Sequence, residues 1–431
     1  MIRKLGDYFI LDTNTTSYVF GILPSGHLEH LYYGSRLNIT SQEECISLVE
    51  KHYCVPGCAI AYSKEHNNIS LEDVRLEVSG AGRGDIREPF IEVIHGDGSY
   101  TSDFVYSNSV ICKGKKPFDT LPGSYEANDK VEELTVYLKD SQYDLTLELH
   151  YYVFEEQDVI SRSAKLLNTG DETVTLKRLM SGQLDFETDG YTFTMFRGTW
   201  AREMQKVDIP VLGGKVVNES YCGCSSNHAN PFVMLSREET SEDYGPCYGL
   251  NLIYSGNHYE AVEVNAYNKT RVVWGINPRM FQFLIAPGEA FEAPEAVMTF
   301  SNQGFGGMSR NMHKFVRECI VRGEWKEKSR PVLLNSWEAA YFNISESKLL
   351  KLAKAGKEAG IELFVMDDGW FGTRDDDTQS LGDWYPNKKK LPKGVAGLAN
   401  KINKLGLDFG IWVEPEMVNT NSDLYRNHPD W

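Results

Sequence analysis

Two adjacent carboxylates, a glycine and an indole stand directly after a short apolar run in this chain of 431 residues. The run covers residues 363–366, and Asp367, Asp368, Gly369 and Trp370 follow it. A continuous apolar run of this length is typical of a strand buried on both faces. In α/β barrels and open α/β sheets, ligands bind at the carboxyl ends of such strands. Two neighbouring acceptors beside an aromatic face suit the hydroxyls and apolar face of a sugar, so we predict sugar binding here.

The adjacency of Asp367 and Asp368 limits which chemistry they can share. Neighbouring residues of an extended strand point to opposite sides, so we do not expect the two carboxylates to form a catalytic pair. The alternative is that Asp368 and Gly369 only form a turn at the strand end and bind no ligand. The burial pattern favours the binding interpretation over the turn.

Two tryptophans also follow apolar runs. Trp337 comes after residues 332–335, and Trp412 lies near the end of residues 407–413. Aromatic side chains at strand ends often only cap a core. We nevertheless favour a pocket position for both rings, and Trp412 is the better candidate.

Several other acidic residues near these strand ends are weaker candidates. Glu414 and Glu416 stand at i and i+2 on one side of a strand end with a stiffening proline between them, a spacing that suits an acid/base pair. A family resemblance carried by longer motifs of this chain assigns them no such role, so we interpret them as supporting hydrogen-bonding residues. Residues 375–377 are three aspartates without the oxygen spacing of a calcium loop, which favours a solvated loop. The sequence does not decide whether the loop segment 381–384 shapes the pocket.

The elements that must position these residues alternate between strand and helix. After Pro331 the pattern predicts strands over 332–335, 361–366 and 407–413, with helices after Ser345 and over 395–404. Three such units match the parallel pattern of a (β/α)8 barrel. A complete barrel takes roughly 250 residues, whereas 431 − 330 = 101 residues remain after Arg330. We therefore expect the sequence to be cut short, with a barrel that is incomplete.

The first 305 residues are typical of a β-protein. Alternation of apolar and polar residues is plain over 134–138 and 143–154, and turn residues separate 160–167 from 172–179. Many short strands over this length predict a large antiparallel β-sandwich. An amphipathic helix over 308–322 follows. We predict three parts: a sandwich over 1–305, a helical connector over 306–330 and the start of a barrel over 331–431.

Composition and charge exclude several classes of partner. Lys and Arg number 44 against 61 Asp and Glu, a net charge of −17. Nucleic acids and anionic membranes bind basic faces, so we expect neither as a partner. The N-terminus lacks an apolar run of signal-peptide length, which predicts a cytoplasmic protein with reduced cysteines. Cys54 and Cys58 near His52, or Cys222 and Cys224 near His228, do not have standard zinc spacing, and we expect no metal.

A family resemblance rests on long motifs in both halves of the chain. In the C-terminal part they are residues 335–342 (NSWEAAYF), 366–372 (MDDGWFG), 381–384 (LGDW), 412–418 (WVEPEMV) and 428–431 (HPDW). In the N-terminal part they include residues 82–89 (GRGDIREP), 225–232 (SSNHANPF) and 287–295 (PGEAFEAPE). With these motifs in collinear order, the chain resembles glycoside hydrolase family 36, the bacterial-type α-galactosidases.

The resemblance implies a β-supersandwich before a (β/α)8 barrel. It also implies hydrolysis of terminal α-linked galactose in oligosaccharides such as melibiose and raffinose, with retention of configuration and without a cofactor. Retention needs two carboxylates about 5 Å apart. In the family both stand on later barrel strands, so we expect the nucleophile and the acid/base residue beyond Trp431 and assign no catalytic residue. By resemblance, Asp367 and Asp368 bind galactosyl hydroxyls, Trp412 packs against the sugar and Trp337 lines the pocket.

Two alternatives remain open at this stage. Within the family, α-N-acetylgalactosaminidase or transglycosylase activity is possible. In a different class, the chain is a non-catalytic galactoside-binding or subunit-assembly protein whose sandwich is the working part. Family members assemble through their sandwiches, which implies a homo-oligomer, with a tetramer as one form. Linkage preference and oligomeric state do not follow from the sequence.

Overall fold

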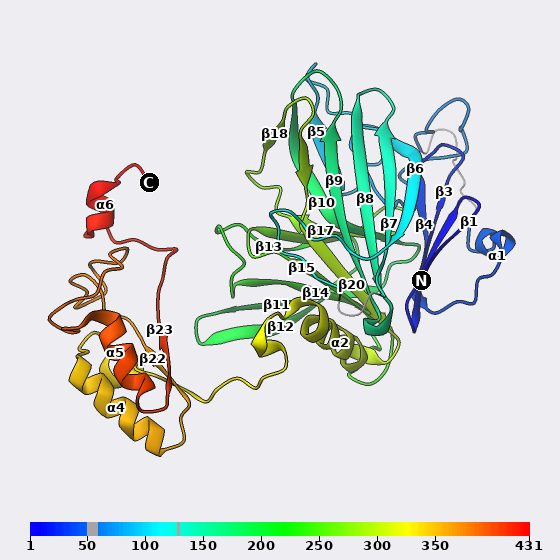
Figure 1. Ribbon diagram of the computed structural model, residues 1–431. Coiled ribbons are helices and arrows are strands. Elements are labelled where there is room, and N and C mark those ends of the chain that lie inside the picture. Colours follow the sequence, from blue (N-terminus) through cyan, green and yellow to red (C-terminus); the bar gives the residue numbers. More distant parts are fainter. Residues whose placement is uncertain (50–58, 127–129) are drawn as a thin grey trace. The chain divides into compact units, whose positions relative to one another are not determined.

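The computed structural model describes residues 1–49, 59–126 and 130–431. These residues form two compact units, Met1–Val321 and Arg322–Trp431, which we call the sandwich unit and the barrel unit (Figure 1). The hypothetical zinc ligands His52, Cys54 and Cys58 lie outside the described residues.

Three antiparallel sheets build the sandwich unit. The first has the order β1-β2-β3-β4, with strands β1 (Ile2–Leu5), β2 (Tyr8–Asp12), β3 (Thr16–Ile22) and β4 (Leu28–Ser35). The second has the order β13-β16-β17-β10-β18, with β5 also paired to β10; its strands are β5 (Ile91–Ile94), β10 (Val174–Phe186), β13 (Gly214–Ser220), β16 (His258–Val264), β17 (Thr270–Ile276) and β18 (Phe283–Ile285).

The third sheet is the largest, with ten strands. Its order is β12-β11-β14-β15-β20-β9-β8-β7-β6, and β19 also pairs with β9. The strands are β6 (Phe104–Lys113), β7 (Glu132–Asp140), β8 (Leu145–Phe154), β9 (Val159–Asn168), β11 (Tyr191–Thr199), β12 (Arg202–Val211), β14 (Ala229–Arg237), β15 (Cys247–Ile253), β19 (Ala290–Glu292) and β20 (Glu295–Ser301). A 3₁₀ turn, η1 (Glu155–Gln157), joins β8 to β9.

Period-two alternation explains how these strands face the core. In β8 the side chains of Leu145, Leu147, Leu149 and Tyr151 are buried, and those between them are half-buried. The predicted hairpin is confirmed, because β7 and β8 pair antiparallel on either side of a turn at Asp140. The turn after β9 is also present, but β10 leaves for the second sheet instead of pairing with β9. The chain thus crosses from one layer to the other at this turn.

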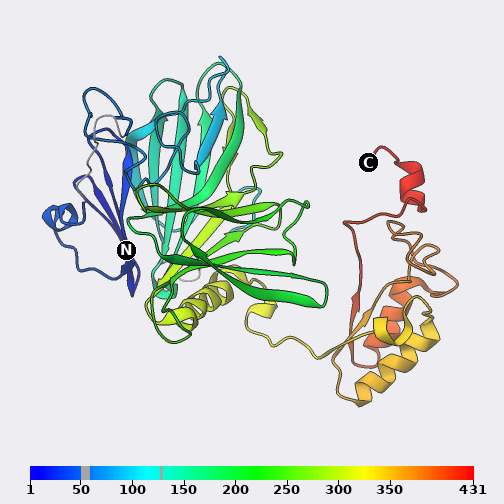
Figure 2. The same cartoon turned by 180° about the vertical axis from the view of Figure 1, so that it is seen from behind.

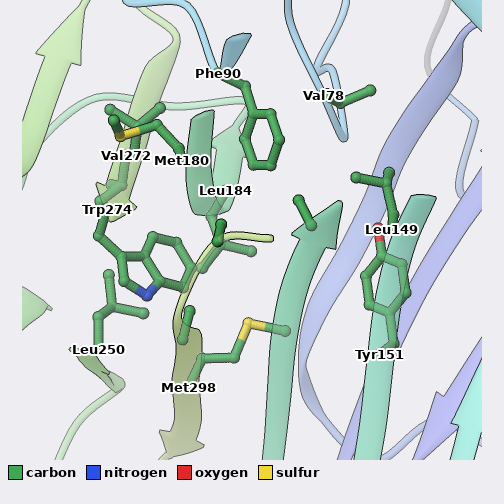
Figure 3. Close-up of a cluster of buried hydrophobic side chains, with 14 of the residues drawn as sticks. Val78, Phe90, Leu149, Tyr151, Met180, Leu184, Leu250, Val272, Trp274 and Met298 are labelled. Carbon is green, nitrogen blue, oxygen red and sulfur yellow. The ribbon is translucent and has the colours of Figure 1, made fainter. Parts of the chain in front are cut away.

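The main core lies between the sheets and centres on Trp274 of β17, which is fully buried. Figure 3 shows its indole among side chains from both layers, with Leu250 and Met298 on one side and Met180 on the other. A Cβ on Gly182 would lie 2.3 Å from this ring. The close approach of β10 to the indole therefore requires glycine at position 182.

Two short helical segments border the sandwich. Helix α1 (Gln42–Ile46) begins at Ser41, which forms a capping box with Glu44. Helix α2 (Gly304–Phe315) continues into a π-helical turn, η2 (Val316–Ile320), and packs on β15 and β20 (Figure 1). Its buried Met308, Met312 and Phe315 form a smaller core with residues of those strands. The amphipathic pattern predicted for this segment thus faces the sandwich.

The long hairpin of β11 and β12 projects from the sandwich as the green ribbon of Figure 2. Trp200 at its turn is 86% exposed, and Leu212 after β12 is 85% exposed. β12 is also the last strand at its edge of the ten-stranded sheet. Exposed apolar side chains beside an unpaired edge strand are typical of a surface that contacts another protein chain.

The barrel unit contains a parallel sheet with the order β21-β22-β23. Its elements are η3 (Glu324–Lys326), β21 (Leu333–Asn335), α3 (Trp337–Ala340), α4 (Glu346–Glu358), β22 (Leu363–Met366), α5 (Gly394–Asn403), β23 (Asp408–Ile411) and α6 (Asp423–Asn427). Helices α4 and α5 contact each other and the strands β22 and β23. An antiparallel sandwich followed by three βα units is the fold class that the sequence predicts, and it is confirmed. In the described ranges, no helix is both long and apolar enough to span a membrane.

Candidate functional site

Strand register brings the candidate residues to one edge of the parallel sheet. Asn335 at the end of β21 stands opposite Val365, and Met366 at the end of β22 stands opposite Ile411. The residues that follow these positions therefore leave the sheet at the same edge. Asp367 and Trp412 are two of them.

Asp367 connects the ends of two strands. Its Oδ2 accepts a hydrogen bond from Asn335 Nδ2 at 2.5 Å, and its Oδ1 accepts one from the backbone N–H of Asp368 at 2.7 Å. Its own N–H donates to Ser336 Oγ at 3.0 Å. Each carboxylate oxygen holds one donor and keeps a further lone pair for a ligand hydroxyl. The side chain is 9% exposed.

Asp368 points to a different set of partners. Arg374 Nη2 lies 2.8 Å from its Oδ2, and Arg374 Nε lies 3.1 Å from its Oδ1. The backbone N–H of Gly369 donates to Oδ1 at 2.6 Å. This two-pronged arginine contact fixes the plane of the carboxylate and neutralises its charge. Asp367 and Asp368 are thus held by separate groups, as adjacent residues at a strand end should be.

Arg374 is itself held on several sides. Its Nη1 donates to Asn419 Oδ1 at 3.0 Å and to a backbone carbonyl, and its guanidinium lies over the rings of Phe342 and Phe371. Lys390 Nζ then donates to the carbonyl oxygens of Phe342, Gly369 and Arg374 at 2.8–3.0 Å. The loop that carries Arg374 is therefore tied to the strand end that carries Asp368.

The two tryptophans occupy different surroundings, and both are half-buried. Trp412 belongs to an aromatic group with Trp370 and Trp384, and its carbonyl accepts from Trp370 Nε1 at 2.9 Å. Trp337 begins α3 and meets Tyr341 edge-on, with 5.1 Å between the ring centroids. Trp412 follows β23 and Trp337 follows β21, so both residues follow strands that end at the same sheet edge as the strand before Asp367.

The carboxylates after Trp412 differ from each other. Glu414 is half-buried and Glu416 is exposed. Burial raises the pKa of Glu414, and the charges of Glu416 and Asp368 raise it further. A raised pKa means that the carboxyl of Glu414 keeps its proton to a higher pH than an ordinary glutamate. No contact of Glu414 defines a chemical role.

The neighbouring loop residues have structural partners. Asp383 accepts from the backbone N–H groups of Asp423 and Leu424 and so caps the first turn of α6. In the acidic stretch, Asp375 pairs with Lys390 and Asp376 bonds to Thr378. Across the described ranges, no cluster of three or more His, Cys, Asp and Glu side chains has metal-binding geometry.

Sequence reasoning did not single out the side chains that surround the two aspartates. Asn335 and Arg374 contact the carboxylates, whereas Lys390 and Asn419 hold Arg374 and its loop. Asn335 stands at the end of a predicted strand, so the argument that selected Asp367 could also have selected Asn335. Arg374 is a single basic residue next to three aspartates, a pattern that is typical of a solvated loop rather than of a buried ion pair.

The comparisons with known proteins match both parts of the chain. The model of the glycosyl hydrolase family 36 N-terminal domain matches residues 26–286, and the Melibiase model matches residues 290–431. α-Galactosidase AgaA of Geobacillus stearothermophilus is 40% identical over 98% of this chain, and α-galactosidase Mel36A of Lactobacillus acidophilus is 36% identical over 98%. The crystal structure of α-galactosidase AgaB from Geobacillus stearothermophilus superposes with a TM-score of 0.95 at 39% identity, covering all of this chain.

The chain is thus a sandwich-and-barrel protein, a β-sandwich followed by parallel βα units with acidic residues at a strand end. The chain belongs to glycosyl hydrolase family 36, so the resemblance seen in the sequence is confirmed. The chain spans 58% of AgaA, 57% of Mel36A and 59% of the AgaB structure. Structures of AgaA variants contain raffinose or stachyose.

Proposed function

We propose that this chain supplies the sandwich and the galactose-holding strand ends of a retaining α-galactosidase. The observation that carries the proposal is the pair of buried aspartates after β22, each fixed by separate donors. Fixed carboxylates bind sugar hydroxyls at little entropic cost. The α-galactosidase names of the relatives and the raffinose and stachyose bound to AgaA variants support an α-galactoside as the substrate.

The contacts at the strand ends support the roles that we propose for the two aspartates. Asp367, with a free lone pair on each oxygen, accepts from galactosyl hydroxyls, and Asp368 does so on the side that Arg374 leaves open. Trp412 offers a ring to the apolar face of the sugar, and Trp337 lines the pocket. The described contacts assign neither a nucleophile nor an acid/base carboxylate, so we expect this chain to bind galactose without hydrolysing α-galactosides.

We also propose the remaining properties of the molecule. The division into a sandwich over 1–305, a connector over 306–330 and a barrel start over 331–431 is supported by the passage between compact units at residues 321 and 322. A cytoplasmic protein with reduced cysteines is part of the same proposal. The exposed Trp200 and Leu212 beside the edge strand β12 support a homo-oligomer, and sedimentation at two concentrations tests this.

The test measures galactose binding and hydrolysis with the same purified protein. Galactose should raise the melting temperature of the barrel unit, and p-nitrophenyl α-galactoside should not be hydrolysed. Asp367→Asn should weaken galactose binding about tenfold or more, because it removes one charged acceptor. Asp377→Asn is the matched control, since it makes the same change at an exposed position of the neighbouring loop.

Two outcomes would contradict the proposal. If galactose leaves the melting temperature unchanged, the strand ends do not form a sugar site. If the chain hydrolyses the aryl galactoside and Glu414→Gln abolishes turnover, the catalytic groups lie within this chain and the assignment of roles is wrong.

A further inference from the structure

A short turn in the sandwich unit carries two exposed cysteines. β13 ends at Ser220, and Cys222, Gly223 and Cys224 bend the chain before β14 begins at Ala229. Gly223 has a φ of +96°, a left-handed conformation that glycine adopts without strain. The chain therefore bends sharply between the two cysteines.

The turn is tied to the neighbouring connection between β15 and β16. The N–H of Gly223 donates to Asn257 Oδ1 at 2.8 Å, and the N–H of Ser225 donates to the carbonyl of Ser255 at 2.7 Å. These bonds stand on either side of Cys224. The relative positions of Cys222 and Cys224 are therefore set by the fold and not by a free loop.

The sulfur of Cys222 lies within hydrogen-bond distance of two groups. Its Sγ is 3.4 Å from Ser220 Oγ and donates to the carbonyl oxygen of Cys224 at 3.4 Å, which also accepts from the hydroxyl of Ser220 at 2.8 Å. The hydroxyl of Ser220, with help from the backbone N–H of Cys224 and the hydroxyl of Ser226, lowers the pKa of Cys222 to about 7. A lowered pKa gives Cys222 a larger thiolate fraction at neutral pH than an ordinary cysteine has.

Other cysteines of the described ranges have the opposite environment. Burial raises the pKa of Cys247 to about 12, and burial also raises the pKa of Cys45. Cys112 is exposed, but desolvation and the charge of Glu133 raise its pKa. The thiolate character of Cys222 is therefore a property of the turn and not of exposure alone.

The spacing of the two cysteines permits a disulfide. Residues i and i+2 are joined by two steps of 3.8 Å, so their Cα atoms lie within about 7 Å and closer at a bend. Disulfides span Cα distances of roughly 4.4–6.8 Å. Two thiols alone are too few ligands for a protein metal site, and no third ligand joins them in the described residues.

We propose that the Cys222-Gly223-Cys224 turn is a thiol–disulfide exchange site whose oxidant is the disulfide of a low-molecular-weight thiol. The thiolate of Cys222 attacks one sulfur of that disulfide, the S–S bond breaks, and one thiolate leaves with its electron pair. Cys224 loses its proton to solvent, attacks the sulfur of Cys222 and expels the second thiolate. The protein loses two electrons and two protons, and one small disulfide becomes two thiols.

The test uses the whole reduced chain with glutathione disulfide as the probe. Peptide mass mapping should show a peptide containing both residues with a mass lower by two hydrogen atoms. Cys224→Ser should stop the reaction at the glutathione adduct on Cys222. Cys222→Ser should remove both products. Serine is nearly isosteric with cysteine and the turn is exposed, so both variants should retain the parent melting temperature.

Cys112 provides a control within the same molecule. In iodoacetamide labelling of the unaltered chain at pH 7, Cys222 should react roughly fivefold faster than Cys112 or more. The higher thiolate fraction of Cys222 outweighs the lower nucleophilicity that accompanies a lower pKa. Equal labelling rates would overturn the proposal, as would a glutathione adduct on Cys222 that persists although Cys224 is present. Binding of Zn²⁺ with micromolar affinity at these thiols, without exchange, would also overturn it.

Discussion

The sandwich unit and the barrel unit both bury an arginine against a carboxylate, but the two pairs join different lengths of chain. Arg162 Nη1 lies 3.0 Å from Glu77 Oε1 in the sandwich, across 85 residues. Arg374 Nη2 lies 2.8 Å from Asp368 Oδ2 in the barrel unit, across six residues. The first pair links parts of the chain that are distant in sequence, whereas the second holds a loop against the strand that precedes it.

The further partners of each pair strengthen this contrast. Glu77 also accepts from the hydroxyls of Tyr18 in β3 and Tyr151 in β8, and Arg162 donates to the carbonyl of Gln183 in β10 at 2.7 Å. The network thus ties all three sheets of the sandwich. Burial would raise the pKa of Glu77, but Arg162 and its other donors outweigh burial and keep that pKa below its usual value.

The pair in the barrel unit organises its surroundings locally. Asp368 is bonded to Gly369 and Arg374, and Arg374 reaches Asn419 after β23. These contacts all lie at the carboxyl edge of one sheet. We conclude that buried ion pairs of the same chemistry serve stability where they connect distant strands and serve orientation where they connect a strand end to its own loop.

The largest effect is expected from Arg162→Leu. This change leaves Glu77 buried without its cation, which typically costs about 3–5 kcal/mol of the free energy of unfolding. Calorimetry that resolves the transition of the sandwich unit measures the loss. Replacing both Arg162 and Glu77 by leucine should recover a large part of it, because no charge then remains unpaired.

The exposed pair of Lys206 and Asp208 in the same unit is the control, with side-chain exposures of 43% and 48%. Lys206→Met should leave the transition of the sandwich unit in place. A comparable loss in both single variants would show that net charge, and not the buried network, determines the stability.

The contrast also explains what the sequence could predict. The alternation in β8 and the apolar run of β22 are local patterns, and both elements are where the sequence predicts them. The pairing of β10 in another sheet could not be predicted from a local pattern, because the turn after β9 has the sequence of a hairpin turn. Likewise, nothing near Arg374 in the sequence reveals that its side chain is 5% exposed and faces Asp368. Partners chosen by tertiary packing cannot be inferred from one segment.

A smaller effect is expected from pH at His150, which bridges β7 and β8. Burial alone would lower its pKa, but hydrogen bonds to Glu133 and Glu148 raise the pKa to about 9, against about 6.5 when unfolded. The folded state therefore holds the proton more tightly. Its contribution is fully present below pH 6.5 and is lost as the pH rises through 9, by about 2–3 kcal/mol. Urea unfolding at pH 6 and pH 9.5 measures this.

His150→Gln should remove that part of the pH dependence, since glutamine keeps hydrogen bonding but cannot be protonated. His228→Gln, at an exposed position, is the matched control and should keep the parent profile. If both variants lose the same pH dependence, the histidine bridge between the strands is not its source.

The smallest loss of stability but the sharpest loss of function is expected from Arg374→Leu. The partners of Asp368 lie within its own loop at the sheet edge, so water can reach the unpaired carboxylate once the loop relaxes, and we expect a cost of about 1–2 kcal/mol in the barrel unit. Galactose affinity should nevertheless fall about tenfold or more, because the plane of the Asp368 carboxylate is no longer fixed. Arg374→Lys should recover the charge without the two-pronged contact and restore stability more than affinity. Calorimetry with and without galactose separates the two quantities. One result would contradict this prediction: Arg374→Leu destabilises the protein as much as Arg162→Leu does, and galactose affinity is unchanged. The two arginines would then both serve stability, and Arg374 would not orient a ligand-binding carboxylate.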